Sequence, residues 1–172
     1  MARSRSNLGV VAVAFALAGG TAEAQAAISE IQRRYPQDTA LRSVYLPTAD
    51  AALKLRVGKP AESIAELQAA KCCELGTNFG FLPIYIRGQA YLSAQQGAEA
   101  AREFRYIIDH RNFSPVAPEY ALAYLGLARA YKMSNDPIKS RSAYQDFLAL
   151  WKDADPDIPI LKQAKAEYAK LQ

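Results

Sequence analysis

Few residues in this chain have the types and spacing that chemistry requires. The single histidine, His110, could act as an acid or a base, but its nearest carboxylate along the chain is the adjacent Asp109. We interpret it instead as a side chain at the C-terminal end of a helix, where a cation is favoured. Cys72 and Cys73 are adjacent, which strains a disulfide, and no metal-ligand spacing connects them with His110.

An acidic segment near the C-terminus alternates in the manner of calcium ligands. Asp153, Asp155 and Asp157 supply the oxygens, but the glycine and the later bidentate glutamate of a calcium loop are missing. Pro156 and Pro159 also interrupt the segment, so we expect a helix-capping linker. The sequence therefore predicts no catalytic residue, no cofactor and no metal, and the protein is not expected to be an enzyme.

The composition favours one folded domain built from helices. The 172 residues are 51% hydrophobic and 22% charged, so the chain can bury a core. Alanine dominates the apolar content and β-branched residues are sparse, which favours helices. The formal net charge of +4 is mild, and no basic stripe is interleaved with aromatic residues, so a nucleic-acid partner is not predicted.

Small and aromatic residues recur in a pattern with internal steps of three, nine and four residues. The four copies are Ala12, Phe15, Ala24 and Ile28; Ala51, Lys54, Ser63 and Leu67; Gly88, Tyr91, Ala100 and Phe104; and Ala128, Tyr131, Ser140 and Tyr144. The short steps put two residues on one helix face, and the step of nine crosses a turn. Each copy therefore predicts two antiparallel helices that pack on each other. The second copy is degraded, because Lys54 replaces the aromatic residue.

The copies predict an all-α stack of helix pairs. Their first residues lie 39, 37 and 40 positions apart, and such pairs must stack to bury a core. The predicted pairs span about 8–36, 39–73, 83–111 and 119–152, after a disordered tail at 1–6 and before a capping helix at 158–172. We expect Pro47 to interrupt the helix at 39–56. Asp136 is the expected N-cap of the helix that Pro137 starts.

The N-terminal segment permits two interpretations. Two arginines, the apolar run Leu8–Ala18 and small-residue cleavage sites at 22–26 together fit a secretory signal, which would place the protein in the periplasm. The same segment carries the first copy of the pattern, with a turn at Gly19–Thr21 and Thr21 as its N-cap. We favour the repeat helix and a cytoplasmic protein. The apolar run is too short for a membrane span, which needs about 20 residues.

The pattern resembles the tetratricopeptide repeat (TPR), with Gly88, Tyr91, Ala100 and Phe104 at its signature small and aromatic positions. The resemblance covers about residues 7–172 and is most specific in the last two pairs. It implies a right-handed α-solenoid that works by binding proteins. The segment 88–171 also looks like the C-terminal repeat region of bacterial, acidobacterial-type serine/threonine kinases. The chain itself has no glycine-rich nucleotide loop and no DFG triplet.

The resemblance implies a scaffold that binds a protein or peptide in a groove lined by the first helix of each pair, with self-association as a further mode. The candidate groove residues are Tyr85, Arg87, Gln89, Tyr124, Arg129 and Lys132. Two alternatives stay open: a detached regulatory tail of a bacterial kinase or transcriptional regulator, and an exported envelope protein with a cleaved signal.

Overall fold

The computed structural model describes residues 5–71, 75, 80–113 and 117–171 of the chain. Its secondary structure is helical and contains no strand among these residues, which confirms the predicted all-α class. The nine α-helices of the described part are α1 (Arg5–Ala18), α2 (Thr21–Arg34), α3 (Leu46–Arg56), α4 (Pro60–Ala70), α5 (Leu82–Ser93), α6 (Gly97–Asp109), α7 (Pro118–Met133), α8 (Pro137–Leu150) and α9 (Pro159–Ala169).

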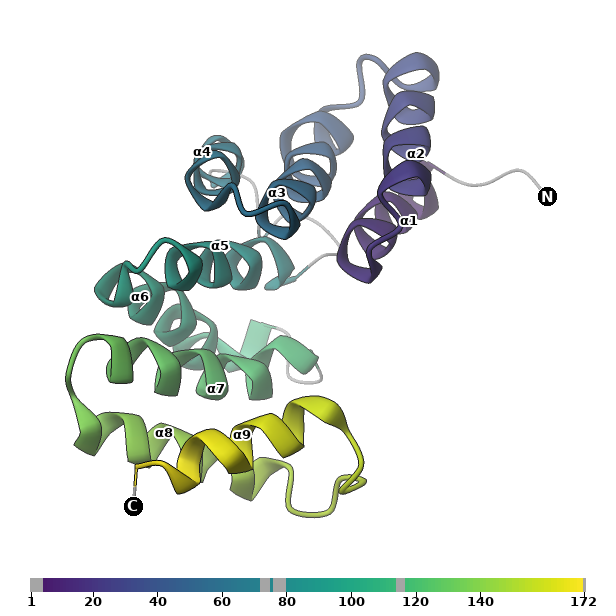
Figure 1. Cartoon of the computed structure of the whole chain (residues 1–172). Helices are drawn as coiled ribbons and strands as arrows, with labels where there is room; N and C mark the ends of the chain where they lie inside the picture. Colours follow the sequence, from purple (N-terminus) through teal and green to yellow (C-terminus); the bar gives the residue numbers. More distant parts are fainter. Residues whose placement is uncertain (1–4, 72–74, 76–79, 114–116, 172) are drawn as a thin grey trace.

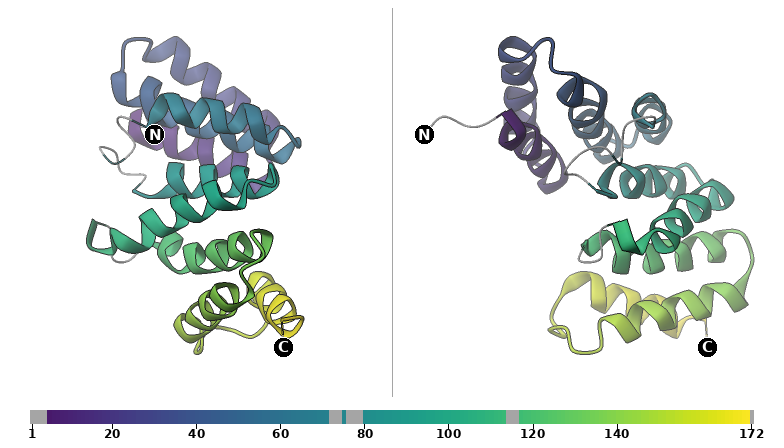
Figure 2. Two further views of the ribbon diagram at one scale, coloured as in Figure 1. Left: turned by 90° about the vertical axis from the view of Figure 1, so that its left-hand side faces the viewer. Right: turned by 180° about the vertical axis from the view of Figure 1, so that it is seen from behind.

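The helices pack in chain order. Each one contacts the next, from α1 and α2 at one end of the molecule to α8 and α9 at the other (Figures 1 and 2). The prediction of a disordered tail at 1–6 is wrong for its last two residues, because α1 begins at Arg5. No helix in the described ranges is both long and apolar enough to cross a lipid bilayer.

One turn geometry joins the two helices of all four pairs. Seven residues after the first residue of each copy, the backbone enters the left-handed region; these residues are Gly19, Gly58, Gln95 and Asn135. The next N–H donates over 2.9 Å to the carbonyl oxygen five residues back; the donor–acceptor pairs are Gly20–Phe15, Lys59–Lys54, Gln96–Tyr91 and Asp136–Tyr131. This arrangement is a Schellman motif, which satisfies carbonyl groups at the end of the first helix. The spacing of the copies thus corresponds to a repeated backbone structure.

The small residues of the pattern lie where the paired helices approach each other. Both small residues of every copy are buried: Ala12 and Ala24, Ala51 and Ser63, Gly88 and Ala100, Ala128 and Ser140. Two of the four pairs add the same hydrogen bond of 2.8 Å, from the serine hydroxyl to the alanine carbonyl twelve residues earlier. At Gly88 a Cβ atom would lie 2.7 Å from the Phe104 ring, so the approach there requires glycine.

Pro47 changes the helix rather than interrupting it, which differs from the prediction. Residues Leu41–Tyr45 form a π-helical turn that continues into α3. Proline has no N–H and its ring clashes with the carbonyl four residues back, and the wider turn accommodates both. The Thr48 hydroxyl donates to the carbonyl of Val44 over 2.6 Å, which satisfies a buried acceptor beside the proline.

The first pair is packed as a repeat, with two corrections to the sequence-based picture. Ala12 and Ile28 are buried as expected, but Phe15 is 38% exposed, because no helix of the described residues covers its side of α1. Ala16 beside it is fully buried. The N-cap of α2 is Gly20, one residue before the predicted Thr21, and no side chain caps it.

Candidate protein-binding surfaces

The six candidate groove residues do not line one surface. Tyr85 and Gln89 lie on one face of α5, whereas Arg87 lies on the opposite face and lines a hollow there. On α7, Tyr124 lines a second hollow on the same side as the first, and Arg129 reaches α9. Lys132 is exposed. The candidates therefore divide between two sides of the stack.

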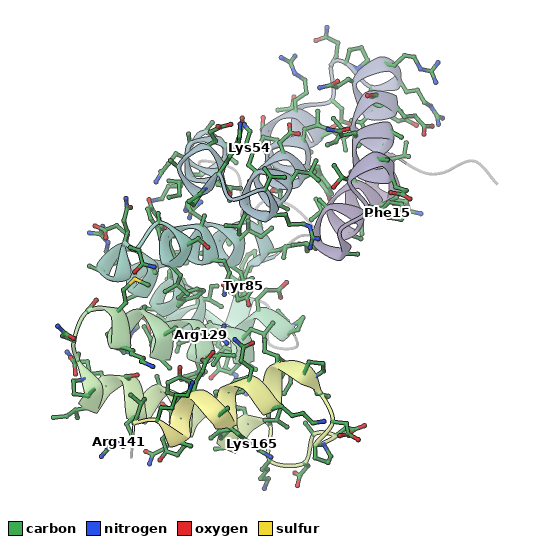
Figure 3. All side chains as sticks on the ribbon, in the orientation of Figure 1. Phe15, Lys54, Tyr85, Arg129, Arg141 and Lys165 are labelled. Carbon is green, nitrogen blue, oxygen red and sulfur yellow. The ribbon has the colours of Figure 1, made fainter. Side chains whose placement is uncertain are left out.

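The side of the stack on which Tyr85 and Gln89 lie carries a hydrogen-bonded network centred on Glu167 of α9. Arg129 donates to both carboxylate oxygens, from Nε over 2.9 Å and from a terminal nitrogen over 3.1 Å. The Tyr144 hydroxyl donates over 2.8 Å, and Gln163 adds a bond of 2.9 Å. Arg129 thus holds α9 in place, and less of the Arg129 side chain is available to a binding partner. Figure 3 locates Tyr85 and Arg129 on successive levels of the stack.

Burial and hydrogen bonding compete in this network. Burial pushes the pKa of Glu167 upward, but hydrogen bonds from Arg129, Tyr144 and Gln163 outweigh burial and hold the pKa below its usual 4.5. Burial raises the pKa of Tyr144, and its bond to the carboxylate raises it further. Burial also raises the pKa of Tyr85. These directions keep Glu167 ionised and both tyrosines neutral near pH 7.

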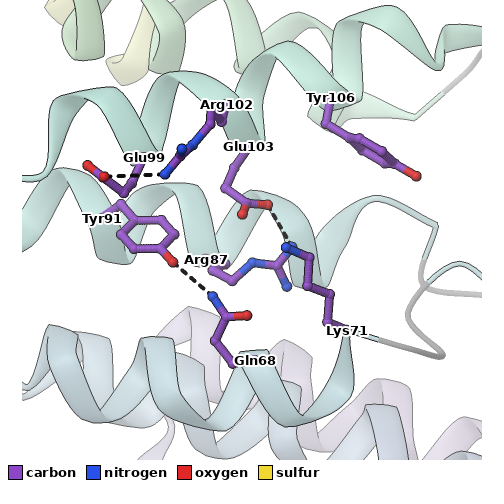
Figure 4. A pocket seen from close by; sticks show the side chains of 8 residues that line it. All are labelled: Gln68, Lys71, Arg87, Tyr91, Glu99, Arg102, Glu103 and Tyr106. Atoms are coloured by element: carbon purple, nitrogen blue, oxygen red, sulfur yellow. Dashed lines mark hydrogen bonds and ion pairs between the residues drawn. The ribbon is translucent and has the colours of Figure 1, made fainter.

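The opposite side of the stack, on which Arg87 lies, carries a polar hollow of about 380 Å³, which we call the α4–α6 hollow (Figure 4). Its lining residues are Gln68 and Lys71 of the second helix of one pair, Arg87 and Tyr91 of α5, and Glu99, Arg102, Glu103 and Tyr106 of α6. Arg87 is only 1% exposed. It donates to Glu103 over 2.6 Å and to the carbonyl of Leu67 over 3.3 Å, so a buried ion pair forms the floor of the hollow.

A smaller hollow of about 260 Å³ lies between α6 and α8, one repeat further along the stack. The register of the pattern matches the two hollows position by position. At both joints a side chain of the second helix donates to a tyrosine hydroxyl of the next pair: Gln68 to Tyr91 over 2.9 Å, and Arg105 to Tyr131 over 2.6 Å. A third bond of the same kind joins Gln145 to the hydroxyl of Tyr168 on α9, over 2.9 Å.

The two hollows differ at the ion pair. Where Arg87 and Glu103 meet in the α4–α6 hollow, the next repeat has Leu127 and Ala143. A buried ion pair is costly to desolvate, and apolar residues of similar volume often replace it without loss of stability. Since this chain uses an apolar pair for the same packing, the charges of Arg87 and Glu103 are not required to hold the helices together. The α4–α6 hollow is therefore the stronger candidate site.

Two of the other chemistry-bearing residues, His110 and Asp155, lie at a helix end and in a linker. His110 is the C-cap of α6; its Nδ1 lies 2.8 Å from the carbonyl oxygen of Tyr106, and its ring stacks on that tyrosine at 4.0 Å. Asp155 accepts a backbone bond from Asp157 within the linker before α9. Cys72 and Cys73 lie outside the described residues. Within the described ranges, no group of three or more histidine, cysteine or acidic side chains could hold a metal ion.

Sequence reasoning missed the second-helix residues of the hollow, because the groove was expected on first helices alone. One signal was present: Arg87 occupies a position where the next copy has Leu127, and a charge inside an apolar pattern needs a partner. Glu103 is that partner.

No protein-family model, curated protein or solved structure matches this chain.

Proposed function

We propose that this chain is a TPR-like, right-handed α-solenoid that serves as a non-catalytic scaffold for a protein or peptide partner. The recurring Schellman turn, the buried small residues and the tyrosine hydrogen bonds at successive joints support this assignment. In such a stack every pair contacts only its neighbours, so side chains at each joint can vary without changing the fold. That freedom suits a surface selected for recognition.

The observation that carries the proposal is the ion pair in the α4–α6 hollow. Arg87 and Glu103 stand where an apolar pair serves the next repeat, and they sit below a rim of Lys71, Arg102 and Tyr106. Three cationic and two acidic side chains, together with the Tyr91 hydroxyl, face a volume large enough for one or two residues of a peptide. The hollow suits a polar, charged segment of a partner, held by hydrogen bonds that the floor orients.

A peptide-display selection against the intact protein tests this function. The counter-selection uses the double variant Arg87→Leu/Glu103→Ala, which copies Leu127 and Ala143 and so keeps the packing of the next repeat. We expect selected peptides to bind the parent and to lose at least about tenfold in affinity on the variant, the effect of one charge-assisted hydrogen bond.

The rival surface supplies the matched control. Glu167→Gln alters the network on the opposite side and leaves the α4–α6 hollow unchanged, so it should bind the selected peptides with the parent's affinity. If that substitution weakens binding while the double variant binds normally, the hollow is not the site. A selection that enriches no peptide at all would count against the scaffold function itself.

A further inference from the structure

The hollow between α6 and α8, which we call the α6–α8 hollow, repeats the lining of the α4–α6 hollow with different chemistry. Every residue that lines the α4–α6 hollow has its counterpart in the pattern among the residues that line the α6–α8 hollow. At three of these positions an apolar side chain replaces a charged one: Ile108 replaces Lys71, Leu127 replaces Arg87, and Ala143 replaces Glu103. The two hollows therefore share one construction but suit different side chains of a partner.

The α6–α8 hollow suits an apolar side chain. Leu127 and Ala143 are each 3% exposed, and Ile108 is half-buried beside them. The volume of about 260 Å³ gives room for one side chain of a partner. An apolar side chain placed there would remove its own surface and that of Ile108 from water, which favours binding.

The charged groups around the α6–α8 hollow do not favour an acidic residue in it. Lys139 pairs with Asp136 over 2.8 Å and lies over the Tyr131 ring. Arg105 donates to the Tyr131 hydroxyl over 2.6 Å, so both cations are engaged within the chain. Asp146 also lines the hollow and would repel an acidic residue of a partner.

The α4–α6 hollow, in contrast, presents hydrogen-bond donors and positive charge. Lys71 is exposed at its rim. Arg102 is 75% exposed and donates to Glu99 over 3.3 Å; a guanidinium has five N–H donors, so others remain for a partner. The Tyr91 hydroxyl accepts a bond from Gln68 and still has its own hydrogen to donate. This arrangement suits a carboxylate, which accepts several such bonds.

Helix α6 sets the distance between the two hollows. Arg102 and Tyr106 of α6 line the α4–α6 hollow, and Arg105 and Ile108 of the same helix line the α6–α8 hollow. A helix with its side chains is about 10–12 Å wide. An extended chain advances about 3.3 Å per residue, so three or four residues cross α6.

We infer that one extended segment of the partner occupies both hollows, with an acidic side chain in the α4–α6 hollow and an apolar side chain, three or four positions away, in the α6–α8 hollow. The inference rests on the proposed function and narrows the partner to a segment with defined residue types and spacing. A helical segment would have to place the same two side chains about seven positions apart, because it advances about 1.5 Å per residue.

The peptides that the display selection enriches test this inference directly. We expect them to carry an aspartate or glutamate and a leucine, methionine or phenylalanine three or four positions apart. In a synthetic copy, replacing the apolar residue by alanine should weaken binding to the parent protein about tenfold, because a large apolar side chain is no longer buried. Replacing the residues between the two anchors by proline should preserve most of the affinity, since proline keeps the segment extended.

Ile108→Lys supplies the matched variant, because it copies Lys71 into the α6–α8 hollow. It should bind the selected peptide and its alanine copy equally, whereas a loss of folding would weaken both and leave their ratio unchanged. Ser142→Arg, which copies Arg102 at an exposed position, should reduce the same ratio and serves as the second variant. Val57→Lys adds a cation at an exposed position outside both hollows and should keep the parent's ratio.

The possible failures separate the inference from the proposed function. Peptides that lose affinity on Arg87→Leu/Glu103→Ala but keep their apolar preference on Ile108→Lys and on Ser142→Arg would overturn the inference alone. Anchors about seven positions apart, with binding abolished by the prolines, would overturn it in favour of a helical partner segment. A selection that enriches no peptide would remove the proposed function and the inference together.

Discussion

At the scale of the residue, single and double substitutions of Arg87 and Glu103 should have different effects on the free energy of unfolding. Glu103→Ala would leave a guanidinium that is 1% exposed without its carboxylate, and such losses cost about 3 kcal/mol. Arg87→Leu combined with Glu103→Ala removes both charges and should recover most of that loss; the remainder reflects the smaller alanine and the lost bond from Arg87 to the Leu67 carbonyl. Urea titration followed by circular dichroism measures both. A double variant as unstable as the single one would mean that the pair itself holds the repeat together.

Glu167 makes the stability depend on pH in a defined direction. Its folded-state pKa lies below 4.5, so its contribution is fully present above that value and is lost as the pH falls through the lower, folded pKa. Glu167→Gln should cost about 1.5 kcal/mol at pH 7, the worth of a charge-assisted hydrogen bond, and nothing once Glu167 is protonated in the parent. Thermal unfolding of both proteins from pH 7 to pH 3 measures the difference.

The variant is compared with the parent because the pKa values of two other carboxyl groups shift upward, opposite to the pKa of Glu167. Burial raises the pKa of Asp50 and of Glu119, and both groups are present in either protein, so their effects cancel in the difference. Glu62→Gln serves as the control: its 3.0 Å pair with Lys59 is exposed and should contribute little at any pH. A constant gap between Glu167→Gln and the parent down to pH 3 would contradict the depressed pKa.

At the scale of the element, the sequence predicted what depends on local geometry. The steps of three, nine and four fixed the helix pairs, the turns and the buried small residues, since these follow from one helix and its successor. The exposure of Phe15 depends on whether another pair precedes α1, and no local pattern carries that information. Helix periodicity alone puts Arg87 on the face of α5 opposite Tyr85 and Gln89, but which face lines a hollow depends on the helices that pack against each one. The groove was therefore the least predictable part.

The close approach of α5, α6 and α7 offers an element-scale prediction. A Cβ atom at Gly126 would lie 2.5 Å from the Phe104 ring, and one at Gly88 would lie 2.7 Å from it, so the ring has no room on either side. Gly126→Ala gains about 1 kcal/mol of helix propensity but should still destabilise the protein, because overpacking costs about 1–3 kcal/mol. Adding Phe104→Leu should restore part of the loss in urea titrations. Strictly additive effects would show that the two residues do not compete for space.

The place of α1 in the fold distinguishes the two interpretations of the N-terminus. Leu8, Ala12 and Val13 are buried in one cluster with Ile28 and Ile31 of α2. A chain that lacks residues 1–26 should lose the remaining helicity of α2 along with α1, because those isoleucines would face water. Circular dichroism of the truncated protein measures this. A truncated chain with an intact α2 and a sharp thermal transition would favour the cleaved signal instead.

At the scale of the whole molecule, the core is divided unequally along the stack. The cluster around Leu8, Ile31 and Leu41 fills the N-terminal end, and a larger cluster around Phe104, Tyr144 and many others fills the C-terminal end. The fully buried side chains of the joint between them are mostly small, Ala16, Ala24, Ala51, Ala52, Leu67 and Ile86, and three partly exposed leucines, Leu53, Leu55 and Leu82, pack against them. Because stabilisation by burial scales with apolar area, alanines couple the two ends weakly. A stack of this kind depends on its nearest-neighbour joints, and the weakest joint decides where it separates.

We therefore expect the two ends to unfold at different urea concentrations. The only tryptophan, Trp151, packs 5.0 Å from Phe147 in the C-terminal cluster, so its fluorescence reports on that end alone, whereas circular dichroism reports on every helix. The circular dichroism transition should begin before the fluorescence changes. Ile86→Ala should widen the gap, because it removes one of the two large side chains that are buried at the joint and leaves Trp151 and its neighbours untouched. Coincident transitions in both proteins would show that the alanine joint transmits stability as well as the larger clusters do, and that the molecule folds as one cooperative unit.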